Sequence, residues 1–340
     1  MQPELEIDPD IRRARTLPSR FYTDERYFES SRERIFARSW QMLCRRGDVR
    51  TLLPVTLLPY FLDEPLLLSR IGDDIVCLSN VCTHRGKVLV EEPCDARLIR
   101  CGYHGRRFGL DGKFLSMPEF DGVEDFPSPA DDLRRVASDV AGEFVFASLD
   151  PAATFEEFLD RNVAVWFAER TRGLKFAGSR EYDVDAHWAL YCENYLEGFH
   201  IPYVHRSLNE VVDYGTYTTE TFRYSSLQTG YDDRGEEAGR YLFVFPNLMF
   251  NFYPWGLSVN VVRPVTPRRT KVEFLTYVAD ESKLGKGAGA DLHGVELEDE
   301  AVVESVQRGI RSRFSDRGRY SPTREQGTHH FHRLIAECMG

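Results

Sequence analysis

The sequence predicts an α+β protein with a small all-β domain followed by a larger domain built on an antiparallel sheet. Between residues 41 and 150, short apolar runs alternate with turn residues. After Pro151 a helical pattern begins, and longer strand-like runs then follow at short intervals, which favours an antiparallel sheet. A chain of 340 residues is long enough for two domains with cores of their own.

The first elements can be justified from caps and turns. A short amphipathic helix is expected after Thr23 or Asp24, because both are good N-caps. The apolar face of that helix comprises Tyr27, Phe28, Ile35 and Phe36. Gly72-Asp73-Asp74 and Asp111-Gly112 are typical of hairpin turns. The strands of the small domain are expected at residues 65–69, 75–79, 97–101 and 143–149.

The second domain begins with a helix that Thr154 caps. One side of this helix carries Phe155, Phe158, Leu159, Val163, Trp166 and Phe167. Strands follow at residues 173–184, 216–230, 240–253, 257–264 and 271–280. The glycine-rich run at residues 284–291 lacks the Gly-Lys-Ser/Thr ending of a phosphate-binding loop, so a flexible loop is expected there.

Composition and charge exclude several classes of function. The apolar content is 42% and the formal net charge is −11. Phosphate contacts need clustered Lys and Arg, so neither nucleic acid nor an anionic membrane is an expected partner. The apolar run at residues 52–62 is too short to span a membrane and contains Pro54 and Pro59. The seven cysteines are an odd number and no secretory signal precedes them, so we expect a cytoplasmic protein without disulfides.

Two short loops carry the strongest motif. Cys82-Thr83-His84 and Cys101-Gly102-Tyr103-His104 each supply one Cys and one His. A [2Fe–2S] cluster held by two His and two Cys defines a Rieske centre. A structural zinc site has the same stoichiometry, but zinc spacing usually pairs Cys with Cys and His with His. Gly86 and Gly105 follow the loops and let backbone N–H groups turn toward the cluster sulfurs. The ligands predicted for this Rieske cluster are Cys82, His84, Cys101 and His104.

The same loops resemble those of the Rieske non-haem iron oxygenases, the terminal (alpha) components of aromatic-ring-hydroxylating and quaternary-ammonium-oxidising systems. Respiratory Rieske proteins have an extra Cys in each loop, and those positions are Lys87 and Tyr103 here. Gly102 replaces the Pro that is usual in the family, at a position that is not a ligand. The resemblance covers nearly the whole chain.

The resemblance implies how the chain divides. Residues 41–150 are expected to form the Rieske domain. Residues 1–40 and 151–340 are expected to form a helix-grip catalytic domain with a mononuclear iron, in which a curved antiparallel sheet closes over a long helix.

A second set of metal ligands is predicted around Pro202. Glu197 and His200 are three residues apart, so they share one face of a helix, and His205 follows five residues later. Pro202 disturbs the helix, so a helix end or a one-residue widening brings both imidazoles to one point. Two His and a carboxylate make the facial triad that binds non-haem iron(II) and leaves positions open for oxygen.

Asp299 is the predicted carboxylate of that triad. A helix is expected within residues 291–314, and helical spacing places Asp299 on its apolar face, whereas Glu298 and Glu300 are expected to face solvent. The residues of that face are Val302, Val303, Val306, Ile310 and Phe314. The resemblance implies a carboxylate ligand at the same position. Alone, each His would be a hydrogen-bonding residue and Asp299 an ion-pair partner, but with the Rieske loops they predict a mononuclear iron(II) site.

Glu197 is predicted to orient His200 from the same helix face. In relatives the corresponding acid, usually Asp, links the iron-ligand His to a Rieske His of the neighbouring subunit. The resemblance therefore implies a bridge from Glu197 to His104 across the interface of a homotrimer, with or without a small second subunit. Glu at this position resembles the branch that oxidises carnitine, glycine betaine and choline.

The expected function is that of a terminal oxygenase. Electrons enter at the Rieske cluster and pass to the mononuclear iron, where O2 is activated to hydroxylate an organic substrate. The sequence contains no dinucleotide-binding Gly-x-Gly-x-x-Gly after a strand and no plant-type Cys cluster, so a separate reductase, ferredoxin or both must supply the electrons. The alternative is an electron-transfer Rieske protein fused to a helix-grip ligand-binding domain, which would hold only the iron of the cluster.

The substrate class stays open between aromatic ring compounds and quaternary or N-methylated amines. Aromatic residues on two expected strands belong mostly to the core, but some could stack on a flat ring or cage an ammonium group. These residues are Phe243, Phe245, Phe250, Phe252, Tyr253 and Trp255. Five other histidines lack a spaced partner and are expected to be surface or hydrogen-bonding residues: His187, His293, His329, His330 and His332.

Overall fold

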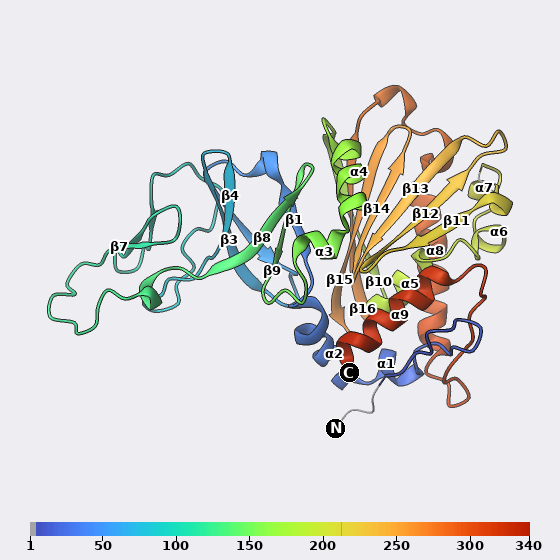
Figure 1. The fold of residues 1–340 in the computed structure, drawn as a ribbon, viewed down its shortest axis with the longest axis horizontal. Coiled ribbons are helices and arrows are strands. Elements are labelled where there is room, and N and C mark those ends of the chain that lie inside the picture. Colours follow the sequence, from blue (N-terminus) through green and yellow to red (C-terminus); the bar gives the residue numbers. More distant parts are fainter. Residues whose placement is uncertain (1–4, 212) are drawn as a thin grey trace. The chain divides into compact units, whose positions relative to one another are not determined.

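The computed structural model describes residues 5–211 and 213–340, which form two compact units (Figure 1). The smaller unit comprises Ala37–Ala152. The larger unit comprises the chain up to Phe36 together with Ala153–Gly340. Both units contain antiparallel sheets, and the larger adds long helices, which confirms the predicted α+β class.

The smaller unit contains two antiparallel sheets, one with the strand order β1-β9-β8-β4-β3-β2 and one with the order β5-β6-β7. The bounds of the strands are β1 Gln41–Arg45, β2 Leu52–Leu57, β3 Glu64–Ile71, β4 Asp74–Ser79, β5 Ile99–Arg100, β6 Arg107–Phe108, β7 Phe114–Ser116, β8 Arg135–Ala141 and β9 Phe144–Ser148. Short 3-10 helices cover Arg46–Asp48 and Pro129–Asp131. The predicted hairpin turns are confirmed, because Gly72 (φ +63°) joins β3 to β4 and Gly112 (φ +84°) joins β6 to β7.

Strand β3 is buried on both faces, so the smaller unit has a core on each side of it. Leu67 packs into one core, which also contains Cys82 and Cys101. Leu66 and Leu68 point to the opposite face and pack into the other core. The two cysteines of the predicted cluster are therefore anchored in packed side chains, at 3% and 2% exposure.

The larger unit is built on a seven-stranded antiparallel sheet with the order β10-β16-β15-β14-β13-β12-β11 (Figure 1). The strands are β10 Lys175–Val184, β11 Thr218–Thr221, β12 Ser225–Tyr231, β13 Glu237–Val244, β14 Leu248–Tyr253, β15 Gly256–Thr266 and β16 Arg269–Val278. The runs predicted as single strands at residues 216–230 and 240–253 are each two strands joined by a hairpin, because a short turn interrupts each apolar run.

The helices of the larger unit begin where the sequence predicts good caps. Asp24 accepts a hydrogen bond from the Arg26 N–H at the start of α2, and Thr154 forms a capping box with Glu157 at the start of α3. The helices are α1 Ser19–Thr23, α2 Glu25–Ser31, α3 Phe155–Leu159, α4 Arg161–Thr171, α5 Trp188–Tyr195, α6 Ile201–Val204, α7 Arg206–Asn209, α8 Leu292–Gly309 and α9 Gln326–Met339. A π-helix at Arg32–Phe36 follows α2, and 3-10 helices cover Tyr214–Thr216, Glu281–Lys283 and Gly287–Gly289.

The predicted apolar face of α8 is wrong in part. Val306 is 44% exposed, and Phe314 lies beyond the end of the helix and is 92% exposed. The buried residues of α8 are Glu296, Val303 and Gln307. This face is partly polar because it meets hydrogen-bonding partners on and beside α5, among them Tyr191 and the His187 backbone.

Helix α5 connects α8 to the sheet, because it contacts both α8 and β15. Its start is fixed by buried rings: His187 lies 5.3 Å from Phe21 and 5.6 Å from Tyr22, between ring centroids. Burial lowers the pKa of His187 to about 3, so this imidazole is neutral. His187 is thus a buried hydrogen-bonding residue, with Nδ1 accepting from the Ala189 N–H.

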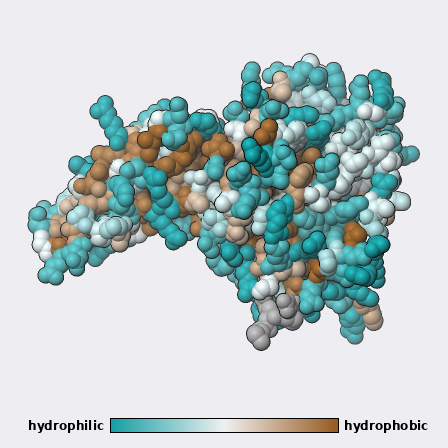
Figure 2. All heavy atoms as spheres, viewed as in Figure 1, coloured by the Kyte–Doolittle hydropathy of each residue, from teal (hydrophilic) through white to brown (hydrophobic). Residues whose placement is uncertain are grey.

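Two further features concern the predicted absence of a membrane-spanning segment and of disulfides. Within the described residues, no helix is both long and apolar enough to cross a membrane. All seven cysteines lie in the described part of the chain, and no disulfide joins any two of them there. Figure 2 shows a mostly polar face, with an apolar strip over the strands of the smaller unit.

Gly327 in α9 is expected to be essential for the packing beside Glu197. A Cβ at this position would lie 2.4 Å from the backbone oxygen of Leu196, the residue before Glu197. Gly327→Ala should therefore lower the free energy of unfolding by about 1–3 kcal/mol, because the added methyl group overpacks this contact. A calorimetric scan should show a Tm lower by a few degrees. Gly309→Ala is the matched control, since a Cβ there meets nothing within 4 Å. An equal loss in both variants would contradict the packing argument.

Candidate metal centres and substrate cavity

The two Cys-His loops of the smaller unit have the same backbone geometry. In the first loop the Gly86 N–H donates to the Cys82 oxygen over 3.0 Å, and in the second the Gly105 N–H donates to the Cys101 oxygen over 3.1 Å. Gly86 and Gly105 have φ values of +71° and +76°, a region that only glycine adopts without strain. The two turns therefore require glycine at these positions, and they present each Cys and His pair in the same way.

The four side chains of the loops lie close together. The rings of His84 and His104 are 4.8 Å apart between centroids, and the Cys82 and Cys101 thiols share a hydrogen bond. Backbone N–H groups also reach the sulfurs, from His84 and Arg85 to Cys82 and from Tyr103 to Cys101.

This donor set fits a Rieske cluster. His104 Nδ1 is buried and has no hydrogen-bond partner among the described residues, although a buried imidazole nitrogen normally has one. A metal ion would satisfy that nitrogen, and the backbone N–H groups would hydrogen-bond to the cysteine sulfurs that bind the cluster.

A buried arginine that was not predicted from the sequence lies behind the second loop. Arg106 is 2% exposed and forms an ion pair of 2.6 Å with Asp131, while its guanidinium lies 4.9 Å from the Phe114 ring centroid. The only signal for this role is its position directly after the His104-Gly105 turn.

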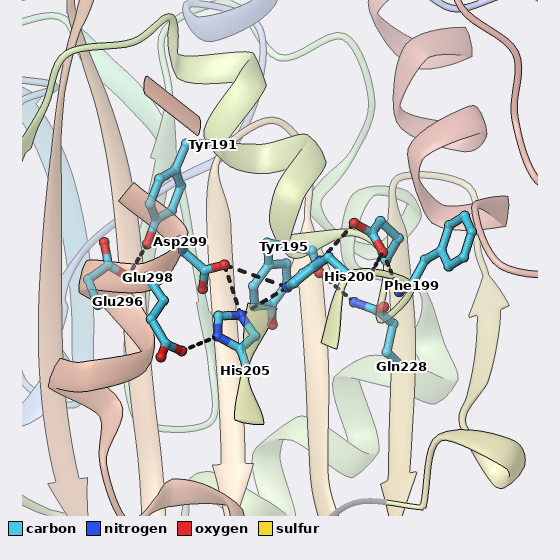
Figure 3. Close-up of polar contacts among 10 residues, drawn as sticks. Tyr191, Tyr195, Phe199, His200, His205, Gln228, Glu296, Glu298 and Asp299 are labelled. Atoms are coloured by element: carbon cyan, nitrogen blue, oxygen red, sulfur yellow. Dashed lines mark hydrogen bonds and ion pairs between the residues drawn. The ribbon is translucent and has the colours of Figure 1, made fainter. Parts of the chain in front are cut away.

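The predicted ligands of the second site converge in the larger unit. The ligand atoms of His200, His205 and Asp299 all lie within 4.8 Å of one another. The two Nε2 atoms are 3.1 Å apart, and Asp299 Oδ1 is 3.0 Å from Nε2 of His205 and 3.5 Å from Nε2 of His200 (Figure 3).

The chain brings these ligands together by leaving the helical path. Helix α5 ends at Tyr195, so Glu197 lies in an irregular turn and not on the predicted helix face with His200. His200 is the N-cap of the short helix α6 and His205 is its C-cap, with Pro202 in its first turn. The prediction that Pro202 disturbs the helix is therefore wrong, because α6 continues through Pro202, but the alternative of a helix end is confirmed, since α6 ends at His205 and both imidazoles meet across its single turn.

Two glutamates fix the orientation of the imidazoles. Glu197 Oε1 is 2.7 Å from Nδ1 of His200. Glu298 Oε2 is 2.8 Å from Nδ1 of His205 (Figure 3). An ionised carboxylate only accepts hydrogen bonds, so each Nδ1 carries the proton and each Nε2 presents a lone pair. Two lone pairs and a carboxylate oxygen at hydrogen-bond distance repel one another unless a cation lies between them, so this donor set fits a metal ion.

The prediction that Glu298 is an ordinary solvent-facing acid is wrong. Its side chain is 46% exposed, yet its carboxylate is the partner of His205. The error arose because the apolar face was used to orient α8, whereas the side chain of Glu298 reaches around the helix to the imidazole. Its position beside Asp299 was the available signal.

The acids around His205 also couple metal binding to pH. Burial disfavours the imidazolium, but the hydrogen bonds and charges of Asp299 and Glu298 outweigh it and raise the pKa of His205. Because a protonated imidazole cannot bind a metal, protons compete with the metal more strongly here than at an ordinary histidine, and metal affinity should fall as the pH decreases.

A cavity of about 110 Å³ adjoins these ligands, and aromatic rings form much of its wall. The aromatic lining residues are Tyr191, Tyr195, Tyr217, Tyr241, Tyr253 and Phe274. Tyr217 stacks on Tyr241 with ring centroids 6.4 Å apart, and Tyr253 meets Tyr241 edge-on at 5.9 Å. Polar groups complete the wall, including Asn251, Asn260 and Glu296.

The strand aromatics behave largely as core residues. Of the six strand aromatics considered as possible substrate contacts, Tyr253 lines the cavity. Phe250 and Phe252 instead pack against Phe167 and Trp166 of α4. Alternation along β14 explains this division, because Asn251 and Tyr253 point to one face and Phe250 and Phe252 to the other.

Most residues of the cavity wall were not predicted from the sequence. Tyr191 and Tyr195 are four residues apart on α5, and Tyr241 pairs with Asn251 across β13 and β14. The helical and strand periodicities were thus available as signals, but only the pairing of the strands brings these residues to one place.

Two family models match the chain. The model of the Rieske [2Fe-2S] domain matches residues 39–127, and that of the ring hydroxylating alpha subunit (catalytic domain) matches residues 171–235 and 213–340. This chain belongs to the Rieske oxygenase alpha subunits. Membership confirms the predicted family, and with it the Rieske cluster, the mononuclear iron and the function as an oxygenase.

Named relatives agree with this assignment. The Rieske oxygenase is 30% identical to the chloroplastic choline monooxygenase of Arabidopsis thaliana, over 97% of this chain and 85% of that protein. It is 27% identical to the carnitine monooxygenase oxygenase subunit of Escherichia coli (strain K12), over 95% of this chain and 94% of that protein. The structure of the quaternary ammonium Rieske monooxygenase CntA in complex with L-carnitine has a TM-score of 0.80 at 27% identity, covering 98% of this chain and 97% of that one.

The family also defines the general chemistry. Rieske oxygenases of this kind use a small-molecule substrate, O2 and electron-transfer partners, and they form multimers. The alternative of an electron carrier with a ligand-binding domain is not supported, because the larger unit matches a catalytic domain and brings together the three predicted iron ligands.

Glu298 is expected to tune the affinity for iron without being a ligand. Glu298→Ala should lower iron affinity about 10- to 100-fold, because the loss of the partner frees the His205 ring. Asp299→Ala should reduce the iron content to the share of the cluster. Iron analysis and chelator competition measure both effects, and Glu300→Ala on the same helix should keep normal affinity. Equal affinity in Glu298→Ala and Glu300→Ala would contradict the role of Glu298.

Proposed function

We propose that this Rieske oxygenase is the terminal component of a monooxygenase that oxidises small quaternary ammonium compounds. The observation that carries the proposal is the aromatic cavity beside the facial triad. Tyrosine faces attract an ammonium group through cation–π interaction, which contributes about 0.5–2 kcal/mol per contact. The similarity to choline and carnitine monooxygenases supports the same substrate class.

The size of the cavity disfavours the second candidate, hydroxylation of aromatic rings. An apolar cavity of about 150 Å³ is known to bind benzene. The cavity here measures about 110 Å³ and is partly polar, so a compact trimethylammonium group suits it better than a fused ring system. The strand aromatics that could stack on a flat substrate are mostly committed to the core.

The proposed ligands are Cys82, His84, Cys101 and His104 for the cluster and His200, His205 and Asp299 for iron(II). When bound, these centres supply electrons and activate O2. The protein's own residues do the rest: Glu197 and Glu298 keep the two imidazoles in the tautomer with free Nε2 atoms. The tyrosines of the cavity hold the methylated nitrogen beside the triad and exclude water from it.

We also propose that the active multimer is a homotrimer, in which Glu197 links His200 to His104 of an adjacent subunit. Glu197 already accepts hydrogen bonds from His200 Nδ1, from the His200 N–H over 3.0 Å and from the Phe199 N–H. A carboxylate has about four lone-pair positions, so one remains for a fourth donor. A separate reductase, ferredoxin or both would deliver electrons, and a cytoplasmic location stays a prediction from the cysteine content.

Substrate oxidation tests the proposed function. Oxygen uptake with a surrogate reductase should be fastest with trimethylammonium compounds such as choline, slower with N,N-dimethyl amines, and absent with naphthalene and benzoate, because only the first group fills an aromatic cage of this size. A Cys82→Ser variant without Rieske absorption is the control for uncoupled consumption. Turnover of arenes alone would refute the proposal.

Glu197 variants test the proposed bridge. Glu197→Gln keeps the size but loses the charge that accepts two imidazole N–H bonds, and Glu197→Ala removes the contact. Both should keep cluster and iron, while the reduced cluster discharges more slowly when substrate and O2 are added, and Glu197→Ala should be the slower of the two. Mixed oligomers of His104→Ala and His200→Ala chains should regain part of the activity. Wild-type discharge in Glu197→Ala, or an active dilute monomer, would show that no such bridge operates.

A further inference from the structure

Glu296 lies in the cavity without a role in the metal centre. It is 4% exposed and sits one helical turn before Asp299 on α8, next to the triad. Its Oε2 accepts a hydrogen bond of 2.7 Å from the Tyr191 hydroxyl (Figure 3). Its Oε1 is buried and has no hydrogen-bond partner among the described residues. A buried carboxyl oxygen without a partner is costly in free energy, so its presence requires an explanation.

A chain of hydrogen bonds holds the Glu296 carboxyl in place. Asn251 Nδ2 donates to Asn260 Oδ1 over 3.1 Å, and the Asn260 side chain hydrogen-bonds in turn to the Tyr191 oxygen. The Tyr191 hydroxyl is thereby oriented to donate its hydrogen bond to Glu296. The network satisfies each of its members except Glu296 Oε1, so it positions one carboxyl oxygen for a group that is not part of the described chain.

The charges of the cavity wall point to a cation as that group. Three carboxylates line the cavity, whereas its described lining contains no Lys or Arg. Glu197 and Asp299 are engaged by the imidazoles of His200 and His205, which leaves Glu296 as the acid of the cavity wall that has a buried oxygen without a described partner. Burial raises the pKa of Glu296 well above its usual range; the hydrogen bond from Tyr191 opposes this shift, and the charge of Asp299 adds to it. A cation beside the carboxyl would favour the ionised form.

We propose that Glu296 is the anionic partner of the substrate's ammonium group and selects cations with an uncharged tail over zwitterions that carry a carboxylate. The inference rests on the proposed function, since it concerns the same cavity, and it distinguishes substrates within that class. A substrate carboxylate would find no basic side chain in the described wall and would lie near three acids, whereas a hydroxyl tail can bond to Asn or Tyr groups. Glu296 would thus separate choline-like from carnitine-like compounds.

Binding measurements on the holoenzyme test the role of Glu296. Isothermal titration with choline, its neutral carbon isostere 3,3-dimethylbutan-1-ol and L-carnitine compares cation, neutral and zwitterion of similar shape. The wild type should bind choline about tenfold or more tightly than either of the others. The neutral isostere cannot form the buried charge pair with Glu296, and the carboxylate of L-carnitine would have no basic partner in the cavity.

Glu296→Gln is the decisive variant, because it keeps an acceptor for Tyr191 and removes only the charge. It should weaken choline binding about tenfold or more and leave the isostere within about threefold of the wild type. Glu300→Gln, on the same helix but outside the cavity wall, should bind all three ligands as the wild type does. Cluster absorption, iron content and Tm should be unchanged in both variants.

The outcomes separate this inference from the proposed function. If the wild type oxidises quaternary ammonium compounds but binds choline no better than its neutral isostere, or prefers carnitine, the role of Glu296 is refuted and the proposed function stands. If Glu296→Gln lowers the affinities for choline and for the isostere equally, Glu296 has a structural role, and its proposed role in binding the ammonium group is also refuted. If no quaternary ammonium compound binds or is oxidised, the proposed function and the proposed role of Glu296 are both refuted. Should Glu296→Gln not fold, the comparison of ligands on the wild type alone still decides.

Discussion

The site in the larger unit depends on the contact between helix α8 and the irregular chain that follows α5. From α8, Asp299 lies 3.0 Å and Glu298 2.8 Å from opposite nitrogens of His205, which is 1% exposed. From the chain after α5 come His200 and its partner Glu197. Two imidazole nitrogens and a carboxylate oxygen are thus held close together, and the packing of α5 against α8 and β15 keeps the two ligand-bearing segments in place.

The backbone around the site is shaped by close approaches rather than by regular helix. Gly198 lies under the Tyr217 ring, where a Cβ would come within 2.9 Å of a ring carbon, and Gly327 of α9 lies against the Leu196 oxygen. These contacts hold the turn that contains Glu197 from two sides. A regular helix through residues 196–205 could not bring His200 and His205 to one point, because five residues rotate a side chain far past its starting direction. The short helix α6 solves this by ending at both ligands.

Under the proposed function, the cavity would combine two kinds of selectivity in one wall. The rings of Tyr217, Tyr241 and Tyr253 form an electron-rich surface that would favour a compact, positively charged group. The hydrogen-bonded chain that ends at Glu296 adds a charge of fixed position. The sheet, α5 and α8 supply much of this wall, and the irregular chain at Glu197 and Tyr217 completes it, so mostly regular elements would place a substrate.

The sequence by itself was sufficient to predict two ligand sets, because metal chemistry restricts residue type and spacing so strongly. The predicted sets are Cys82, His84, Cys101 and His104 for the cluster and His200, His205 and Asp299 for the iron, and the structure brings the members of each set close together. The sequence also determined the α+β class and the caps at Asp24 and Thr154, which are local in the chain. The tertiary structure alone decided what depends on distant neighbours. Glu298 and Glu296 differ from ordinary helix acids only because His205 and Tyr191 lie beside them. The tyrosine wall likewise exists only once β13, β14 and α5 meet, since hydrogen bonding, burial and charge pairing are properties of contacts and not of spacing.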